Sequence, residues 1–221
     1  MLSGFYSAME KKGKKGDLLF WLFGVFFIIL GILAFINAFL NLESAIPLWF
    51  SYIAVFLIGI GIITKNSDLI AIQANILFIP YIFWNIDFFY QLATSRPLWG
   101  ITDYFFIKGW MNSLGNFITL EHIYIVPVSI GFIYLLGAHR KDLWKISLLE
   151  IATIFFMTFF LSSSEMNANC VFSSCISFIS LESPGYQILW FFTVFIMIFL
   201  TNHLLVYLMK KADRFDMKPD E

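Results

Sequence analysis

Charged side chains are scarce in this chain of 221 residues, and their scarcity narrows what the protein can be. Asp, Glu, Lys and Arg make up 13% of the sequence, about half the share of a typical soluble domain, whereas hydrophobic residues make up 60%. The net charge is −1 and the mean hydropathy is +0.81. This composition excludes a disordered chain, a soluble globular enzyme and a basic nucleic-acid-binding protein.

Motifs that mark common chemistries are also missing. The sequence has no phosphate-binding glycine loop and no nucleophile elbow. Its three histidines are predicted in three different places: His122 near the outer face, His139 in a cytoplasmic turn and His203 near the cytoplasmic face. They predict no shared metal site, which separates the chain from seven-span zinc hydrolases with clustered histidines. We assign no metal ligands, and the cofactor, if there is one, stays unknown.

Cysteine is equally rare, with Cys170 and Cys175 as the two copies. They lie in one predicted outer segment, and on the oxidising side of a membrane such a pair can form a disulfide. The alternative is a catalytic thiol at Cys170. A thiol oxidase that passes electrons to a quinone needs a second cysteine pair, so the sequence disfavours that class.

Long apolar blocks are what the sequence has in abundance. A helix that crosses a membrane needs about 20 mostly apolar residues, and none of the blocks alternates with the period of a β-strand, so helices are favoured over a barrel. Six blocks qualify: Leu18–Leu40, Ala45–Thr64, Leu69–Leu92, Thr119–Gly137, Leu143–Ser162 and Tyr186–Met209. We therefore predict an all-α membrane bundle of six transmembrane helices (residues 18–209), between a basic tail (1–17) and a charged tail (210–221).

Lysines and arginines predict the orientation of this bundle, because they favour the cytoplasmic side of a membrane. Twelve of the fourteen lie in the two tails and at the turns after the second and fourth blocks, which an even number of spans puts on one side. The other two, Arg96 and Lys108, lie in the loop after the third block. Both termini are therefore predicted to be cytoplasmic, in a multi-pass protein of the cell membrane.

Polar residues near the ends of the apolar blocks form a predicted outer layer. It holds Asn85 and Asp87 at the end of the third block, Glu121 and His122 at the start of the fourth, and Asn169 after the fifth. A histidine beside a carboxylate is typical of a general base, so His122 is the candidate base, with Asp87 or Glu121 to orient it. The alternative is that these side chains are hydrated near the membrane surface and cap helix ends.

A second polar layer is predicted nearer the cytoplasmic face. From a rise of about 1.5 Å per residue, Glu150 and His203 lie within about 3–5 Å of the same depth. A carboxylate paired with a histidine is a form in which such groups are tolerated inside a membrane, so the layer is either a functional site or a structural polar lock. Its members are Gln73, Asn75, Glu150, Asn202 and His203.

Four strings carry a resemblance over roughly residues 70–210. They are GITDYFF (Gly100–Phe106), LEHIYIVP (Leu120–Pro127, followed by LLGAHRKDL), NANCVF (Asn167–Phe172) and TNHLLVYL (Thr201–Leu208). In this order they resemble strings of a group of small, uncharacterised multi-pass membrane proteins of prokaryotes. The resemblance implies a shared helical fold and no activity. Cys170 stands where that group is expected to have an aromatic residue, which argues against a catalytic thiol common to the group.

Three functional hypotheses follow, and membrane lipids are the expected partners in each. The first is a membrane-embedded enzyme that acts on a lipid-like substrate near the outer leaflet, with His122, Asp87, Glu121 and Asn169 lining its site. The clustering of polar groups on one side of the bundle favours it. A small-molecule ligand is also possible, and nucleic acid is not expected.

The other two hypotheses differ in what the polar layers do. In a small transporter or permease they form one polar path, which requires Asn75, Glu150 and His203 to lie beneath Asp87 and His122 in a continuous cavity. In a structural or accessory membrane protein the polar groups hydrogen-bond between helices, each is satisfied by a neighbour, and no cavity exists.

Overall fold

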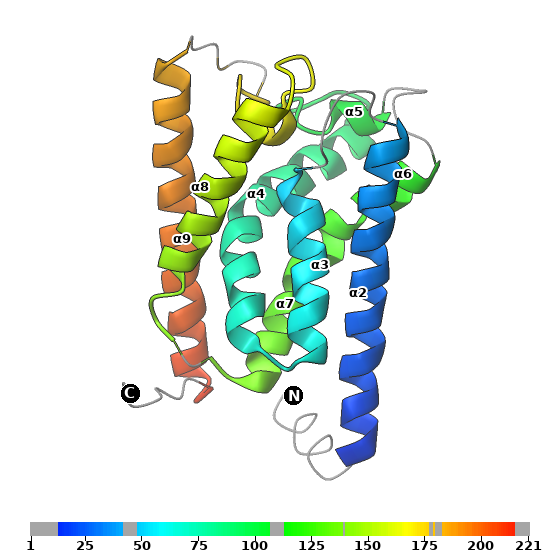
Figure 1. Ribbon diagram of the computed structural model, residues 1–221, viewed down its shortest axis with the longest axis vertical. Coiled ribbons are helices and arrows are strands. Elements are labelled where there is room, and N and C mark those ends of the chain that lie inside the picture. Colours follow the sequence, from blue (N-terminus) through cyan, green and yellow to red (C-terminus); the bar gives the residue numbers. More distant parts are fainter. Residues whose placement is uncertain are drawn as a thin grey trace.

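The computed structural model describes residues 13–41, 48–106, 113–138, 140–176, 179 and 183–214. The all-α prediction is confirmed in these ranges, which hold helices and no β-strand. Figure 1 shows them as a bundle. The helices are α2 (Gly13–Asn41), α3 (Phe50–Ile63), α4 (Ser67–Thr94), α5 (Asp103–Phe106), α6 (Ser113–Thr119), α7 (Glu121–Leu136), α8 (Trp144–Leu161) and α9 (Gly185–Lys211), with a 3-10 turn at Ala168–Cys170.

Five helical stretches are long and apolar enough to cross a membrane. They are Gly16–Leu40, Ser67–Thr94, Leu114–Leu136 (which joins α6 to α7), Trp144–Leu161 and Gly185–Lys211. The second predicted block, Ala45–Thr64, yields α3, which has 14 residues and a length of about 21 Å, against about 30 Å for the hydrocarbon core of a bilayer. The chain is thus a helical bundle of the multi-pass membrane type.

The outer surface of the bundle supports this assignment. Large apolar side chains are exposed along α2, α8 and α9, for example Leu40, Leu149, Phe160 and Ile188, each more than two thirds exposed. A soluble monomer rarely exposes so much contiguous apolar surface, because water disfavours it. In a bilayer the same surface faces lipid at no cost, so these helices have the composition of lipid-facing elements.

Helix α4 is the centre of the bundle. It packs against α3, α7, α8 and α9, and Figure 1 shows it between the α2–α3 pair and the α8–α9 pair, with α7 behind. Because α4 packs against four other helices, its polar side chains meet partners from several of them. Most of the buried polar contacts described below begin on it.

Glycines set the closest approach in the bundle, between α2 and α3. A Cβ atom on Gly59 would lie 2.7 Å from the backbone nitrogen of Ile28 and 2.9 Å from the carbonyl oxygen of Gly24. On the other helix, a Cβ on Gly31 would lie 2.8 Å from the Cβ of Phe56. The two backbones touch where side chains are absent, as small residues permit in membrane helices.

The two ends of the bundle differ in charge. The start of α2, the α3–α4 turn, the α7–α8 connection and the end of α9 lie at one end (Figure 1). The backbone N–H of Ala138 donates to the carbonyl of Arg214 at 2.7 Å, which ties two of these segments together. We call this the basic end, because its described cations are Lys65, Arg140, Lys141, Lys145, Lys210, Lys211 and Arg214. The opposite end, formed by residues 95–106 and 162–176, is called the loop end.

Candidate functional site

A buried carboxylate lies at the loop end, where α4 packs on α7. Glu121 is the first residue of α7 and is 1% exposed. The hydroxyl of Tyr81 on α4 donates to its Oε1 at 2.7 Å. Its Oε2 is buried and has no hydrogen-bond partner in the part of the chain that the structure describes. An unpaired buried carboxylate oxygen is costly, so Glu121 is held here by its surroundings rather than by its own preference.

The neighbouring His122 is oriented through one ring nitrogen. Its Nδ1 lies 2.9 Å from the carbonyl oxygen of Thr119 and 2.9 Å from Oε1 of Glu121. Both neighbours are hydrogen-bond acceptors, so Nδ1 carries the hydrogen and the neutral ring presents the lone pair at Nε2. Among the described residues none pairs with Nε2. Asn85 donates from Nδ2 to the His122 carbonyl at 2.8 Å, which brings three members of the predicted outer layer together.

Aromatic rings enclose the imidazole. The His122 ring stacks on Tyr81, with centroids 4.2 Å apart and planes at 16°, and lies 4.6 Å from the ring of Trp84. The Trp84 Nε1 in turn donates to the hydroxyl of Tyr104 at 2.8 Å. The sequence reasoning missed these three aromatic residues. Tyr81 and Trp84 are three residues apart beside Asn85, so they share a polar face of the helix, and that spacing could have found them.

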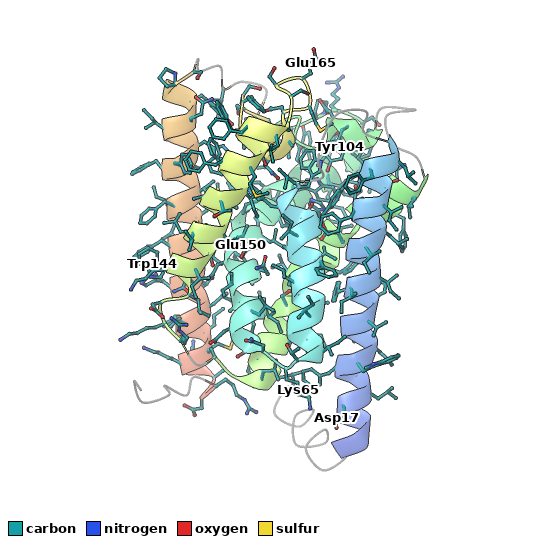
Figure 2. All side chains as sticks on the ribbon, in the orientation of Figure 1. Asp17, Lys65, Tyr104, Trp144, Glu150 and Glu165 are labelled. Atoms are coloured by element: carbon teal, nitrogen blue, oxygen red, sulfur yellow. A yellow bond between two sulfur atoms is a disulfide. The ribbon has the colours of Figure 1, made fainter. Side chains whose placement is uncertain are left out.

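Two phenols belong to this cluster. The Tyr81 hydroxyl donates to Glu121, and the Tyr104 hydroxyl accepts from Trp84. Burial raises the pKa of the Tyr104 phenol far above its ordinary value, and the Glu121 charge adds to this, whereas the Trp84 hydrogen bond acts in the opposite direction. Tyr104 is therefore a neutral phenol at every physiological pH. Figure 2 places it at the loop end, near the top of the bundle.

Asp87 does not orient His122, which corrects the sequence-based expectation. It is fully buried, and its Oδ1 accepts the backbone N–H groups of Leu98 (3.1 Å) and Trp99 (2.7 Å). Its Oδ2 accepts the N–H (2.8 Å) and the hydroxyl (2.7 Å) of Thr102. Four donors satisfy this carboxylate. Asp87 thus holds the loop after α4 against the helix end, and this loop covers the site.

Asn169 also has structural partners rather than a place beside His122. Its Oδ1 accepts the N–H of Phe50 at 2.9 Å, at the start of α3, and its Nδ2 donates to the Leu48 carbonyl (2.5 Å) and to Oγ1 of Thr158 (3.2 Å). Its carbonyl accepts the indole N–H of Trp190 at 3.2 Å. Asn169 therefore joins α3, α8 and α9, and within the described ranges its side chain makes no hydrogen bond to His122.

The two cysteines are bonded to each other. Cys170 and Cys175 form a disulfide, so neither is a free thiol in this structure. The carbonyl of Cys170 accepts the hydroxyl of Tyr186 at 2.5 Å, which fastens the disulfide loop to the start of α9. The loop is a structural feature of the loop end, apart from His122 and Glu121.

The inner polar layer forms a hydrogen-bonded lock between α4, α8 and α9. Gln73 donates from Nε2 to Oε2 of Glu150 at 2.9 Å. Asn75 donates from Nδ2 to Oγ of Ser147 (3.3 Å) and to Oδ1 of Asn202 (3.2 Å). Figure 2 shows Glu150 at mid-height in the bundle. The layer brings together four of its five expected members.

His203 is the fifth member, and it lies apart. Its side chain is exposed, its Nδ1 lies 2.8 Å from the Phe199 carbonyl, and its ring lies 4.0 Å from the Phe199 ring. The expected pairing of Glu150 with His203 is therefore wrong, because Glu150 is bound by Gln73. Helix α9 is apolar around most of its circumference, so hydropathy does not predict which side of it meets α8.

Metal-ligating side chains do not gather within the described ranges: no three His, Cys, Asp or Glu residues come close enough to hold an ion. His139 lies outside the described residues. The site that the structure offers is thus an acid–base pair, Glu121 and His122, packed among the aromatic and phenolic side chains of Tyr81 and Trp84 at the loop end. No family model, curated protein or solved structure matches the chain.

Proposed function

We propose that the chain crosses the cell membrane six times, with both termini in the cytoplasm, and shares its fold with the prokaryotic group that its sequence strings resemble. The start of α2 and the end of α9 lie at the same end of the bundle (Figure 1), which favours an even number of passages. Five long apolar helices and the shorter α3 between α2 and α4 make that number six. The basic end then faces the cytoplasm.

At the loop end we propose a membrane-embedded enzyme that acts on a lipid-like substrate, with His122 as general base. One observation carries this proposal: Nδ1 of His122 is held by Glu121 and Thr119 while Nε2 has no partner among the described residues. A ring held in one tautomer, with its lone pair open, is prepared to accept a proton.

The chemistry starts from a hydroxyl group of the substrate or from water. Nε2 of His122 takes the proton, and the imidazolium that forms is stabilised by the Glu121 carboxylate 2.9 Å from Nδ1. The deprotonated oxygen bonds to the electrophilic centre of the substrate as the bond from that centre to the leaving group breaks, and the same nitrogen returns the proton to the leaving group. Glu121 thus acts as a positioning residue through His122, and the neutral Tyr104 phenol bounds the site next to Trp84.

The substrate is expected to be lipid-like because of the surroundings of the site. Phe88 on α4 contacts Phe105 and Phe106 of α5, with ring centroids 5.1 and 5.4 Å apart, and Trp99 contacts Phe83 at 5.3 Å. An aromatic shell at the end of a membrane helix suits a ligand with an apolar body and a polar head.

The transporter hypothesis has less support. Buried apolar side chains separate the two polar layers: Ile76 and Leu77 on α4, and Ile125 on α7, are each no more than 5% exposed. A polar path would have to pass them. A purely structural role explains Asp87 and Asn169, whose hydrogen bonds are used, but it gives no reason for the open Nε2 of His122.

A complementation experiment tests the enzyme. A strain that lacks the protein receives the wild type, His122→Ala or Tyr207→Ala, and its membrane lipids are profiled by mass spectrometry. We expect the His122→Ala strain to match the deletion strain and the Tyr207→Ala strain to match the wild type, because Tyr207 is exposed on α9 and lies toward the other end of the bundle. A wild-type lipid profile in the deletion strain, or restored by His122→Ala, contradicts the proposal.

A further inference from the structure

An open cavity of about 390 Å³ lies at the basic end, between the α7–α8 connection, the start of α8 and the end of α9. It is far from the Glu121–His122 pair, and the acid–base proposal does not use it. Its charged and aromatic lining residues are Lys141, Lys145, Lys210, Asp142, Trp144 and His203. This volume is within the range of small-molecule sites in proteins, roughly 300–1,000 Å³.

The lining carries an excess of positive charge. Three lysines and one aspartate line it. Asp142 pairs with Lys145, at 3.7 Å, and with Arg140 outside the lining, at 3.2 Å. The Lys141 ammonium has no ion-pair partner among the described residues. The cavity is therefore suited to an anion.

Aromatic rings form one wall of the cavity and continue away from it along α9. The Trp144 ring meets Phe199 at 5.6 Å and Phe195 at 6.0 Å, and His203 lies against Phe199 at 4.0 Å. Lys145 lies 5.9 Å from the Trp144 ring centroid. Beyond this wall the surface is exposed and apolar, as at Leu200, 54% exposed. The lysine-lined opening of the cavity thus borders an apolar surface that faces lipid.

We infer that this cavity binds the phosphate-bearing headgroup of an anionic membrane lipid, whose acyl chains lie along the aromatic wall formed by Trp144, Phe195 and Phe199. Basic pockets between helices at the cytoplasmic surface bind such headgroups, and a tryptophan at the membrane surface sits at headgroup level. A free phosphate compound shares the anionic chemistry but leaves the apolar wall unused. The inference rests on the membrane placement proposed above and is independent of the acid–base site.

Native mass spectrometry of the purified full-length protein tests this site. The protein is delipidated in detergent and titrated separately with phosphatidylglycerol and with phosphatidylcholine, whose headgroup has no net charge. We expect phosphatidylglycerol to bind more tightly. The double variant Lys141→Gln/Lys145→Gln should weaken it about thirtyfold, since each lysine near an anionic headgroup contributes a factor of about five.

The matched control is Lys65→Gln/Lys211→Gln. Both residues are exposed at the basic end (Figure 2 labels Lys65), and neither lines the cavity. This variant loses the same charge and should keep wild-type affinity. Equal weakening in both double variants, or equal binding of the two lipids by the wild type, overturns the inference.

A third measurement distinguishes a bound lipid from a bound soluble anion. Inorganic phosphate at millimolar concentration should leave phosphatidylglycerol bound, because it cannot use the aromatic wall. Displacement of the lipid by phosphate assigns the cavity to a soluble phosphate compound and overturns the lipid assignment. Recovery of the chain outside the membrane fraction of cells contradicts the membrane placement itself, which distinguishes that failure from a failure of the lipid site alone.

Discussion

Glu121 combines features that a purely structural residue has no need for. It is 1% exposed, one carboxylate oxygen is shared by Tyr81 and His122, and the other has no partner among the residues that the structure describes. Leaving a buried polar atom unsatisfied costs about 1–3 kcal/mol. By contrast, each oxygen of the nearby Asp87 accepts two hydrogen bonds. Two carboxylates on neighbouring helices thus have different tasks: Asp87 shapes a loop and Glu121 acts on an imidazole.

Replacing Glu121 by Gln removes the negative charge but keeps the size and shape of the side chain. The amide oxygen can still accept from Nδ1 of His122, so the ring keeps its orientation, but the imidazolium loses its stabilising charge. General acid–base catalysis contributes about 10²–10⁴-fold in rate, and we expect the variant to lose about a hundredfold or more. The measurement is the rate at which the lipid that distinguishes wild type from deletion strain reappears after induction.

The control is Glu165→Gln, an exposed carboxylate at the same end of the bundle (Figure 2). It should leave the rate unchanged. A Glu121→Gln variant that works at the wild-type rate, and is as stable in detergent as the wild type, removes Glu121 from the mechanism and leaves it a packing role.

Which residues meet at the site could be predicted only in part. Hydropathy alone predicts Asn85, Glu121 and His122 at the same depth in the membrane, because each lies at the end of an apolar block. The hydrogen bond from Asn85 to the His122 carbonyl agrees with this prediction. The partners of Asp87 could not be predicted. They include backbone N–H groups of the loop that folds back after α4, and no pattern of side chains in the sequence predicts such contacts.

The helices themselves were more predictable than their ends. The apolar blocks predicted the long helices. The second block, however, holds a helix of 14 residues, because α3 begins at Phe50. The start of α3 is fixed by Asn169, more than a hundred residues away in sequence, whose Oδ1 accepts the Phe50 N–H. A long-range capping contact of this kind has no local signal, so sequence periodicity cannot predict it.

The close contact between α2 and α3 can be tested by measuring the thermal stability of glycine variants. Ala at Gly59 would place a Cβ 2.7 Å from the Ile28 backbone nitrogen, so the two helices must separate. Overpacking costs about 1–3 kcal/mol, and we expect a clear loss of thermal stability in detergent. Gly131→Ala on α7 is the control, because its Cβ meets nothing within 4 Å and alanine favours a helix by about 0.5–1 kcal/mol.

That comparison is informative because both substitutions add one methyl group to a helical glycine. A drop in unfolding temperature for Gly59→Ala alone supports direct backbone contact between α2 and α3. Equal unfolding temperatures for the two variants would mean that α2 packs elsewhere in the native membrane.

For the whole molecule, the distribution of charge is the strongest guide to orientation. The described cations gather at the basic end, whereas Arg96 lies at the loop end beyond α4. Translocation of lysine-rich segments is disfavoured, so the basic end should remain in the cytoplasm. A bilayer about 30 Å thick exceeds the length of α3. In the proposed six-passage arrangement, the segment around Asn169, which hydrogen-bonds to Phe50 and Leu48 at the start of α3, would complete the passage.

Single cysteines placed at the two ends test this orientation. Ser95 and Lys65 are both exposed, one at the loop end and the other at the basic end. In intact cells a membrane-impermeant thiol reagent should label Ser95→Cys, and it should label Lys65→Cys only after lysis, because the proposed orientation places these residues on opposite sides of the membrane. The wild type, with its cysteines joined in a disulfide, supplies the background. Labelling of Lys65→Cys from outside reverses the orientation, and labelling of both from outside is incompatible with α4 as a membrane-crossing helix.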